Sequence, residues 1–273
     1  SRTIPADQYH RDGYVALSGF LTDAEVKELR TACDRLVEEL DPAKHPATVF
    51  STTDEQQPRG DYFIESGDDV RYFFEEEALD DTRQLKVPKH LSLNKIGHAL
   101  HWKVPEFRRV SFSDKVKNLA KQLKFVSPAL VQSMYIFKQP GYGGEVTPHK
   151  DCTFLSTEPQ SCVGLWFALE DATLDNGCMW FSPGSQNTPT KRRFVRTITS
   201  DGGITTEFNA PPDEDDPSKY VAVPVTKGTV VLINGCVNHK SARNTSDKSR
   251  HIYTFHVVER HNTVWDDKNW LQP

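Results

Sequence analysis

A histidine and an aspartate that stand two residues apart, His149 and Asp151, are the first candidates for chemistry in this chain. In extended backbone, side chains two residues apart point to the same face, so both could reach one metal ion. His239 follows an apolar run at residues 229–233 and is a candidate third ligand. Two imidazoles and one carboxylate leave coordination positions open, which suits iron(II) that must also bind an oxoacid and O2.

The same spacing occurs a second time, at His10 and Asp12, with His98 as a possible third member. About one such pair is expected by chance in a chain of this composition, so the spacing does not choose between the sets. The local sequence differs, however. His10 lies in a polar stretch, whereas His149 follows an apolar run and a glycine-rich turn. The local sequence therefore favours the set that contains His149.

Arg250 stands eleven residues after His239, an offset that His98 and Arg109 repeat in the rival set. A guanidinium inside a β barrel needs a carboxylate partner, and a dicarboxylate co-substrate would supply one in bidentate geometry. Ser241, two residues after His239, could add a hydroxyl hydrogen bond. These residues extend the candidate metal site into a candidate dicarboxylate site.

The elements that must position these residues are mainly β from about residue 130 onward. Short apolar runs there are separated by turn signals such as Lys227-Gly228, a texture typical of a β barrel or a double-sheet sandwich. Residues 186–219 are polar and acidic toward their end, and we interpret them as an insertion with some strand content. The expected strands are residues 131–137, 162–169, 179–181, 220–225, 229–233 and 250–258.

The first 128 residues are expected to be helix-rich and to pack on this barrel. Thr22-Asp23-Ala24-Glu25 has the pattern of a capping box and precedes apolar residues that fall on one helical face. Further helices are expected at residues 94–102 and 113–124, and charged loops at residues 43–90. We therefore expect a single domain over residues 1–273, with its β core at residues 129–273.

Composition excludes several classes of function. The formal net charge of the 273 residues is −5 and the lysines and arginines are scattered, so no basic face for nucleic acid is indicated. No apolar run approaches the roughly 18 residues of a membrane span. The five cysteines form no CxxC pair, and residues 1–12 lack the apolar run of a signal peptide. We expect an intracellular, cytoplasmic protein with a small-molecule substrate; the sequence leaves its oligomeric state open.

Specific motifs extend over nearly the whole chain. They are Asp61-Tyr62-Phe63, Asn94-Lys95-Ile96-Gly97-His98-Ala99-Leu100-His101, residues 131–140, Gly143-Gly144-Glu145-Val146, Glu170-Asp171-Ala172-Thr173-Leu174, Asn176-Gly177-Cys178 and Asn269-Trp270-Leu271-Gln272-Pro273. In these motifs, and in the His149 set, the chain resembles the phytanoyl-CoA dioxygenase family.

The resemblance implies a fold, an activity and a site. The fold would be a double-stranded β-helix, a jelly-roll or cupin-like barrel, mainly β with flanking helices. The activity would be that of an Fe(II)- and 2-oxoglutarate-dependent dioxygenase. Such an enzyme uses O2 to hydroxylate a small organic substrate while 2-oxoglutarate is converted to succinate and CO2. The implied iron ligands are His149, Asp151 and His239, and the implied 2-oxoglutarate contacts are Lys95, Met134, Trp166, Ser241 and Arg250.

The chain departs from the family pattern at one residue and in the length of one segment. Lys150 stands between the first two ligands where the family often has glutamine, and it could change the charge near the substrate. The segment between Asp151 and Trp166 is one residue shorter. The carboxylate at position 151 favours hydroxylation over halogenation, because the halogenases that share the resemblance replace it with a small residue.

Alternatives remain beside this reading. A metal-binding barrel without turnover could act as a sensor or interaction module, although Arg250 and Ser241 favour the enzyme. A free small molecule is favoured over an acyl-CoA, because the densest basic cluster, Lys191-Arg192-Arg193, lies in the expected insertion. Cys152 is expected to be a buried structural thiol. Structural or surface roles are expected for His98, His101, His251 and His256.

Overall fold

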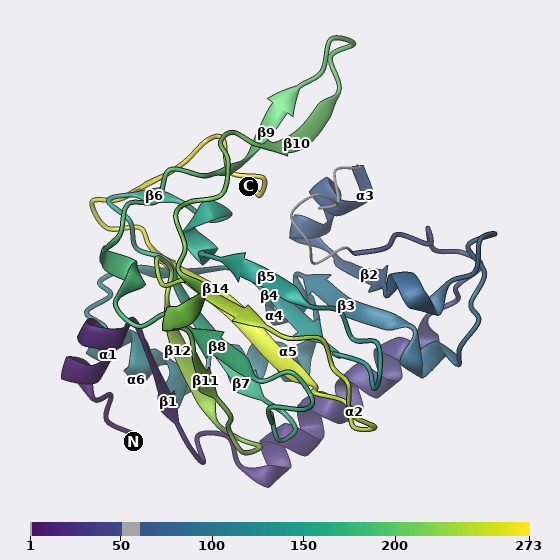
Figure 1. The fold of residues 1–273 in the computed structure, drawn as a ribbon, viewed down its shortest axis with the longest axis horizontal. Helices are drawn as coiled ribbons and strands as arrows, with labels where there is room; N and C mark the ends of the chain where they lie inside the picture. The colour runs from purple at the N-terminus through teal and green to yellow at the C-terminus, as the bar shows by residue number, and fades with distance from the viewer. Residues whose placement is uncertain (1, 51–60) are drawn as a thin grey trace.

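Two facing antiparallel β-sheets form the centre of the computed structural model, which describes residues 2–50 and 61–273 (Figure 1). The major sheet has the order β1 (Tyr14–Leu17), β12 (Val230–Asn234), β7 (Val163–Ala168), β14 (Ile252–Glu259), β4 (Pro128–Ile136), β3 (Leu93–His98) and β2 (Val70–Phe74). The minor sheet has the order β11 (Val221–Val223), β8 (Met179–Phe181), β13 (His239–Ser241) and β5 (Val146–His149).

Between β4 and β14 the chain passes repeatedly from one sheet to the other. In chain order, β4, β7, β12 and β14 join the major sheet, while β5, β8, β11 and β13 join the minor sheet. This path is the double-stranded β-helix, or jelly roll, that the sequence predicted. Two further antiparallel pairs lie outside the sheets: β9 (Phe194–Ile198) with β10 (Ile204–Phe208), and β6 (Thr157–Glu158) with β15 (Val264–Trp265).

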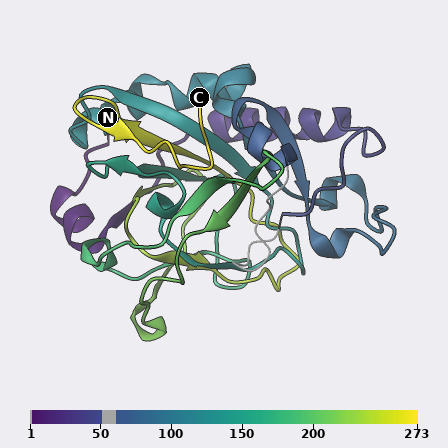
Figure 2. The same ribbon diagram turned by 90° about the horizontal axis from the view of Figure 1, so that it is seen from above.

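Helices such as α2 (Asp23–Glu39) and α5 (Pro105–Ser111) cover the outer face of the major sheet (Figure 2). Leu29 from α2 and Phe107 from α5 share one hydrophobic cluster with Phe167 of β7 and Phe255 of β14. A second cluster lies between the sheets and includes Trp166 of β7. Because both faces of the central strands are covered, β7 is buried at every position. The α-helices are α1 (Ala6–Asp12), α2 (Asp23–Glu39), α3 (Asp61–Ile64), α4 (Leu100–Lys103), α5 (Pro105–Ser111) and α6 (Asp114–Gln122).

The capping box is confirmed at the start of α2. The Thr22 hydroxyl accepts a hydrogen bond from the Glu25 amide at 3.2 Å, and the Glu25 carboxylate accepts one from the Thr22 amide at 2.8 Å. The helix expected at residues 113–124 is also present, as α6. Local sequence signals were sufficient for these two helices.

The helix expected at residues 94–102 is wrong over most of its length. Residues 93–98 form β3, paired with β2 on one side and β4 on the other, and only the end of the segment is helical, as α4. Tertiary pairing has overridden the local preference. Strand β2 likewise lies within the expected loops at residues 43–90, of which residues 51–60 are outside the described part of the chain. The first 128 residues thus contribute three strands to the major sheet.

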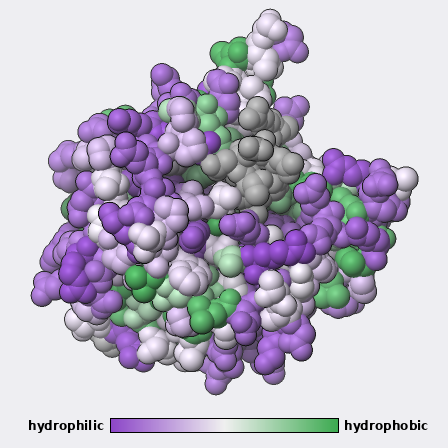
Figure 3. All heavy atoms as spheres, viewed as in Figure 1, coloured by the Kyte–Doolittle hydropathy of each residue, from purple (hydrophilic) through white to green (hydrophobic). Residues whose placement is uncertain are grey.

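The six expected strands are present as β4, β7, β8, β11, β12 and β14, with ends within three residues of the expected ones. The short strands β5 and β13 were not expected. The stretch 186–219 contains the hairpin of β9 and β10, which projects from the rest of the molecule (Figures 1 and 3). Figure 3 shows a face that is mostly hydrophilic. No helix in the described ranges is long and apolar enough to cross a membrane.

Candidate metal centre

Two short strands of the minor sheet bring the candidate histidines together. His149 is the last residue of β5, His239 is the first of β13, and the antiparallel register pairs them directly. Their ring centroids are 4.3 Å apart. Phe181 of β8 stacks on the His239 ring, and the Phe154 ring meets that of His149 edge-on. Packing therefore restricts both imidazoles.

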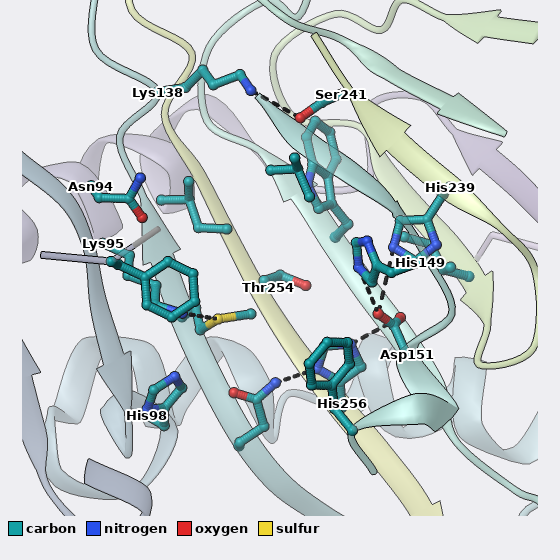
Figure 4. A pocket seen from close by; sticks show the side chains of 18 of the residues that line it. Asn94, Lys95, His98, Lys138, His149, Asp151, His239, Ser241, Thr254 and His256 are labelled. Carbon is teal, nitrogen blue, oxygen red and sulfur yellow. Dashed lines mark hydrogen bonds and ion pairs between the residues drawn. The ribbon is translucent and has the colours of Figure 1, made fainter. Parts of the chain in front are cut away.

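Asp151 completes the group from the short 3-10 helix η5 (Asp151–Thr153). Its Oδ1 atom lies 3.5 Å from Nε2 of His149 and 3.5 Å from Nε2 of His239 (Figure 4). One ligand atom from each residue lies within 4.8 Å of the other two, and this is the one such His/Cys/Asp/Glu group found in the described residues. The donor set and its spacing fit a metal ion that keeps open coordination positions.

Backbone carbonyls set the tautomer of both histidines. Nδ1 of His149 lies 2.9 Å from the Thr147 carbonyl oxygen, and Nδ1 of His239 lies 3.1 Å from that of Val237. A carbonyl only accepts, so each Nδ1 is the protonated nitrogen and donates to it. Each Nε2 faces Asp151 and is the nitrogen that could bind a metal ion.

A third histidine lies behind the carboxylate. Nε2 of His256 lies 3.0 Å from Oδ2 of Asp151, and Nδ1 of His256 lies 2.7 Å from Nε2 of Gln132 (Figure 4). Burial by itself raises the pKa of Asp151, but the neighbouring His256 and His239 outweigh it and hold that pKa well below its usual value. Asp151 is therefore a carboxylate at neutral pH, as a metal ligand must be.

Gly164 of β7 makes room for this arrangement. A Cβ atom at position 164 would lie 3.2 Å from Oδ2 of Asp151 and 3.4 Å from Nε2 of His256. Both contacts are close, so a side chain here would press on the carboxylate and on the histidine behind it. The absence of a side chain at position 164 of β7 therefore leaves room for Asp151 and His256 to meet.

Arg250 lies two residues before β14 and is 1% exposed. Its Nη1 donates to the Gly177 carbonyl oxygen at 2.6 Å, and its Cζ lies 5.3 Å from the ring centroid of Trp166. Its Nε atom is buried without a hydrogen-bond partner in the described residues. Burial lowers the pKa of Arg250 to about 10, so the guanidinium is still charged at neutral pH. A buried cation with an unsatisfied donor fits an anionic ligand.

Lys138 is a second buried basic side chain near this arginine, and the sequence analysis did not single it out. Its Nζ donates to Oγ of Ser241 at 2.9 Å and to the Gly144 carbonyl oxygen at 2.6 Å (Figure 4). Burial, followed by the charge of Arg250, lowers its pKa well below the usual value. Gly177 has φ +93°, and a Cβ there would lie 2.5 Å from Cε of Lys138, so this close approach requires glycine.

Lys95 extends from β3 on the side of the cavity opposite His149 and His239 (Figure 4). Its Nζ lies 3.6 Å from Sδ of Met134 and 3.1 Å from the ring centroid of Phe50. Burial lowers the pKa of this ammonium well below its usual value. An anion bound beside Lys95 would oppose this effect, because it favours the charged form of the ammonium.

All eight site residues expected from the sequence line one cavity of about 180 Å³. Arg250 and Ser241 form its polar end, and the metal-binding group forms one wall. Apolar side chains line much of the remainder: Phe50, Phe63, Phe154, Leu155, Met179, Ile233 and Trp270. The cavity thus combines a candidate metal centre, buried basic side chains and an apolar wall.

The rival set from the sequence is not brought together. His10 belongs to the exposed surface of α1, and Arg109 pairs with Glu28. His98 is buried, with Nδ1 2.7 Å from Oγ of Ser66. The structure thus brings together the set that the local sequence favoured, and not the one that shares its spacing.

The structure places two further residues where the sequence did not point. His256 was expected to have a structural or surface role, and it is buried in the cavity wall, where it contacts Asp151. The sequence contained a signal for this placement: His256 and Thr254 alternate with Tyr253 and Phe255 along β14, so the two pairs face opposite sides of the sheet. Lys150 was expected near the substrate. Instead it is buried away from the cavity lining, where its Nζ donates to Thr188 and to the hydroxyl of Thr190.

Solved structures share this fold. The structure of EctD from S. alaskensis with bound Fe superposes with a TM-score of 0.64 and 20% identity, covering 98% of this chain and 80% of that one. The epimerase SnoN in complex with Fe3+, alpha ketoglutarate and nogalamycin RO gives a TM-score of 0.63 at 17% identity, covering 95% of this chain and 84% of that one. Identities this low establish the fold alone.

Fold and site together define a jelly-roll protein with a centre of two histidines and one aspartate. The family model described as Phytanoyl-CoA dioxygenase matches residues 9–252. Phytanoyl-CoA dioxygenase domain-containing protein 1 of Danio rerio is 51% identical over 270 residues, 97% of this chain and 92% of that protein. Phytanoyl-CoA dioxygenase of Arabidopsis thaliana is 43% identical over 97% of this chain and 92% of that protein. The chain belongs to the phytanoyl-CoA dioxygenase family.

Proposed function

We propose that this protein is an Fe(II)- and 2-oxoglutarate-dependent oxygenase that hydroxylates a small organic substrate. The observation that supports it best is one cavity holding both the His149, Asp151 and His239 group and the buried guanidinium of Arg250. A metal-binding module without turnover has no evident use for a buried guanidinium beside its metal. Iron and 2-oxoglutarate, when bound, would supply O2 activation and oxidative decarboxylation.

His149, Asp151 and His239 would hold the iron. Nε2 of each histidine and Oδ1 of the aspartate face one another, so the three ligands would occupy one side of the ion. The other side would remain open toward the cavity. The carboxylate at position 151 would occupy the iron position that halogenases leave open for a halide, and this supports hydroxylation rather than halogenation.

Arg250 and Ser241 would bind the distal carboxylate of 2-oxoglutarate. The unsatisfied Nε of Arg250 can donate to it, and Ser241 keeps its own hydroxyl proton for donation because its oxygen accepts from Lys138. Trp166 would pack against the guanidinium, while Lys95 and Met134 would contact the co-substrate from the β3 and β4 side. Binding of an anion here would restore the charge that burial disfavours on Lys95.

A free small molecule with an apolar part is the substrate class that the cavity supports. Its wall beyond the metal is aromatic, with Phe63 stacked on Trp270 at 4.6 Å between ring centroids. The basic cluster that a coenzyme A phosphate would need is otherwise engaged. Arg193 donates to Asp266 and Asn269, and the guanidinium of Arg192 lies over the Phe208 ring. Consumption of 2-oxoglutarate with free acids and with the matching CoA thioesters tests this preference directly.

The test of the function is an anaerobic titration of the metal-free protein with iron(II) and 2-oxoglutarate. We expect the visible charge-transfer band of the chelated complex in the parent protein and its loss in His149→Ala. Arg250→Ala should retain iron binding but need a higher concentration of 2-oxoglutarate. The exposed residues His261 and Arg260 provide matched controls as His261→Ala and Arg260→Ala. No band at saturating concentrations would refute the oxygenase and favour the binding module.

A further inference from the structure

Two cysteines from segments far apart in the sequence meet beside the metal centre. Cys152 follows Asp151 in η5, and Cys236 lies in the turn between β12 and β13, three residues before His239. Their Sγ atoms are 3.3 Å apart, and both cysteines are free thiols. Each thiol is therefore on a segment that also supplies a metal ligand.

Backbone hydrogen bonds hold the two segments in this position. The Cys152 amide donates to the Gly235 carbonyl oxygen at 2.8 Å, and the Gly235 amide donates to that of Cys162 at 2.8 Å. The Cys236 amide donates to Oδ1 of Asn234 at 2.9 Å. A Cβ at Gly235 would lie 2.6 Å from the Cys162 oxygen, so the turn has little freedom to move. The approach of the thiols is thus a property of the backbone.

The two thiols differ in access. Cys152 is 1% exposed, whereas Cys236 is partly exposed and can be reached by a small oxidant. The hydrogen bond with Cys152 and the charge of Lys150 lower the pKa of Cys236 to about 7 against the effect of its burial. The accessible thiol is therefore the one suited to react first, and the buried thiol is placed to react second.

We propose that Cys236 and Cys152 form a reversible disulfide when the protein meets hydrogen peroxide. The Cys236 thiolate attacks one peroxide oxygen, the O–O bond breaks, and hydroxide leaves, so Cys236 becomes a sulfenic acid. Sγ of Cys152 then attacks Sγ of Cys236, the S–O bond breaks, and water leaves with the thiol proton. Overall, two thiols lose two electrons and peroxide is reduced to two waters. A thiol reductant reverses the change.

The bond would act on the metal centre. A disulfide holds its sulfur atoms at about 2.05 Å, so the present separation of 3.3 Å must shrink by about 1.2 Å. That movement draws η5, which begins with Asp151, toward the turn that precedes His239. Formation of the disulfide does not depend on the proposed function. Its effect on metal affinity rests on the proposed metal centre.

Peptide mapping tests the disulfide itself. Metal-free protein is treated with hydrogen peroxide, alkylated and digested without reduction. We expect one cross-linked peptide pair joining Cys152 to Cys236, removed by reductant and missing in Cys236→Ser. Cys33→Ala, which changes a cysteine inside α2, should retain the cross-link. Full alkylation of both cysteines after peroxide treatment, or a link from Cys236 to Cys162, would overturn the proposal.

Cobalt(II) titration, after peroxide has been removed, tests the effect on the metal. We expect the oxidised protein to bind cobalt(II) roughly tenfold more weakly than the reduced protein, with recovery after reduction. Cys236→Ser should bind cobalt(II) with the same affinity before and after peroxide treatment. Equal affinities of the oxidised and reduced parent would refute the link to the metal centre. Absence of the charge-transfer band in the titration with iron(II) and 2-oxoglutarate would instead refute the oxygenase. The cross-link result would be unaffected.

Discussion

Nε2 of His256 lies 3.0 Å from Oδ2 of Asp151, while Oδ1 of the same carboxylate faces His149 and His239. The aspartate is thus held from one side so that its other oxygen can serve as a ligand. His256 itself is oriented by Gln132, whose amide nitrogen lies 2.7 Å from Nδ1. His256 is a positioning residue, because it would act on the metal through Asp151.

Replacing His256 with alanine should weaken metal binding by roughly 10- to 100-fold, the usual range for loss of a partner behind a ligand. His256→Gln should recover much of the affinity, because a glutamine amide can donate to Oδ2 of Asp151, which is buried without a hydrogen-bond partner in the described residues. Anaerobic cobalt(II) titration against a competing chelator measures both, with His261→Ala as the control. Equal losses in the alanine and glutamine variants would show that His256 serves packing alone.

Replacing Lys138 with methionine should weaken 2-oxoglutarate binding by about tenfold, or about 1.4 kcal/mol. The change removes the hydrogen bond that orients Ser241 and one positive charge from the end of the cavity that contains Arg250. Iron affinity should not change, because Lys138 does not contact the ligands. Titration of 2-oxoglutarate at saturating iron gives the result, with the exposed Lys121→Met as the control. An unchanged 2-oxoglutarate affinity would contradict this role.

Replacing Glu75 with glutamine should change how stability depends on pH. Burial raises the pKa of Glu75 to about 7, although the Asn94 amide and Lys138 favour its charged form. A raised folded-state pKa gives stability that is complete below the unfolded pKa, near 4.5, and is lost as the pH rises through 7. Ionised Glu75 should therefore cost the fold roughly 3 kcal/mol at pH 8.

Urea unfolding of the metal-free protein, kept in the presence of a chelator, at pH 5 and pH 8 checks this effect. The advantage of Glu75→Gln over the parent should grow from pH 5 to pH 8. The difference between the two proteins isolates Glu75, because Lys138 and the other titrating groups are present in both. A constant difference at the two pH values would mean that Glu75 ionises normally in the fold.

Replacing Lys150 with methionine should destabilise the fold by roughly 1–3 kcal/mol and leave 2-oxoglutarate affinity unchanged. Its ammonium group donates to the carbonyl and hydroxyl oxygens of Thr188 and to the hydroxyl of Thr190, each at 3.0–3.1 Å. The variant leaves these acceptors buried without their donor. Denaturant midpoints and 2-oxoglutarate titration separate the two effects. A large change in 2-oxoglutarate affinity without loss of stability would mean that Lys150 acts at the cavity.

The sequence alone predicted the chemistry of the centre and the elements that depend on local signals. Donor types at His149, Asp151 and His239, the capping box at Thr22 and the apolar runs of the core strands are local features. They predicted the ligand group, the helix that follows Thr22 and a β barrel or double-sheet sandwich, and the family resemblance implied the jelly roll. Arg250 was also found this way, because a buried cation implies an anionic partner. The binding roles of these residues stay predictions.

The tertiary structure decided what depends on the pairing of distant segments. The segment that contains Lys95 is a strand because β2 and β4 pair with it on both sides. His256 reaches Asp151 because the registers of β14 and β7 place it opposite Gly164, where no side chain intervenes. Register is fixed by which faces of two strands are buried together, and a shift of one residue turns every side chain to the other face. No local pattern contains that information, so the contacts around the ligands could be known only from the folded chain.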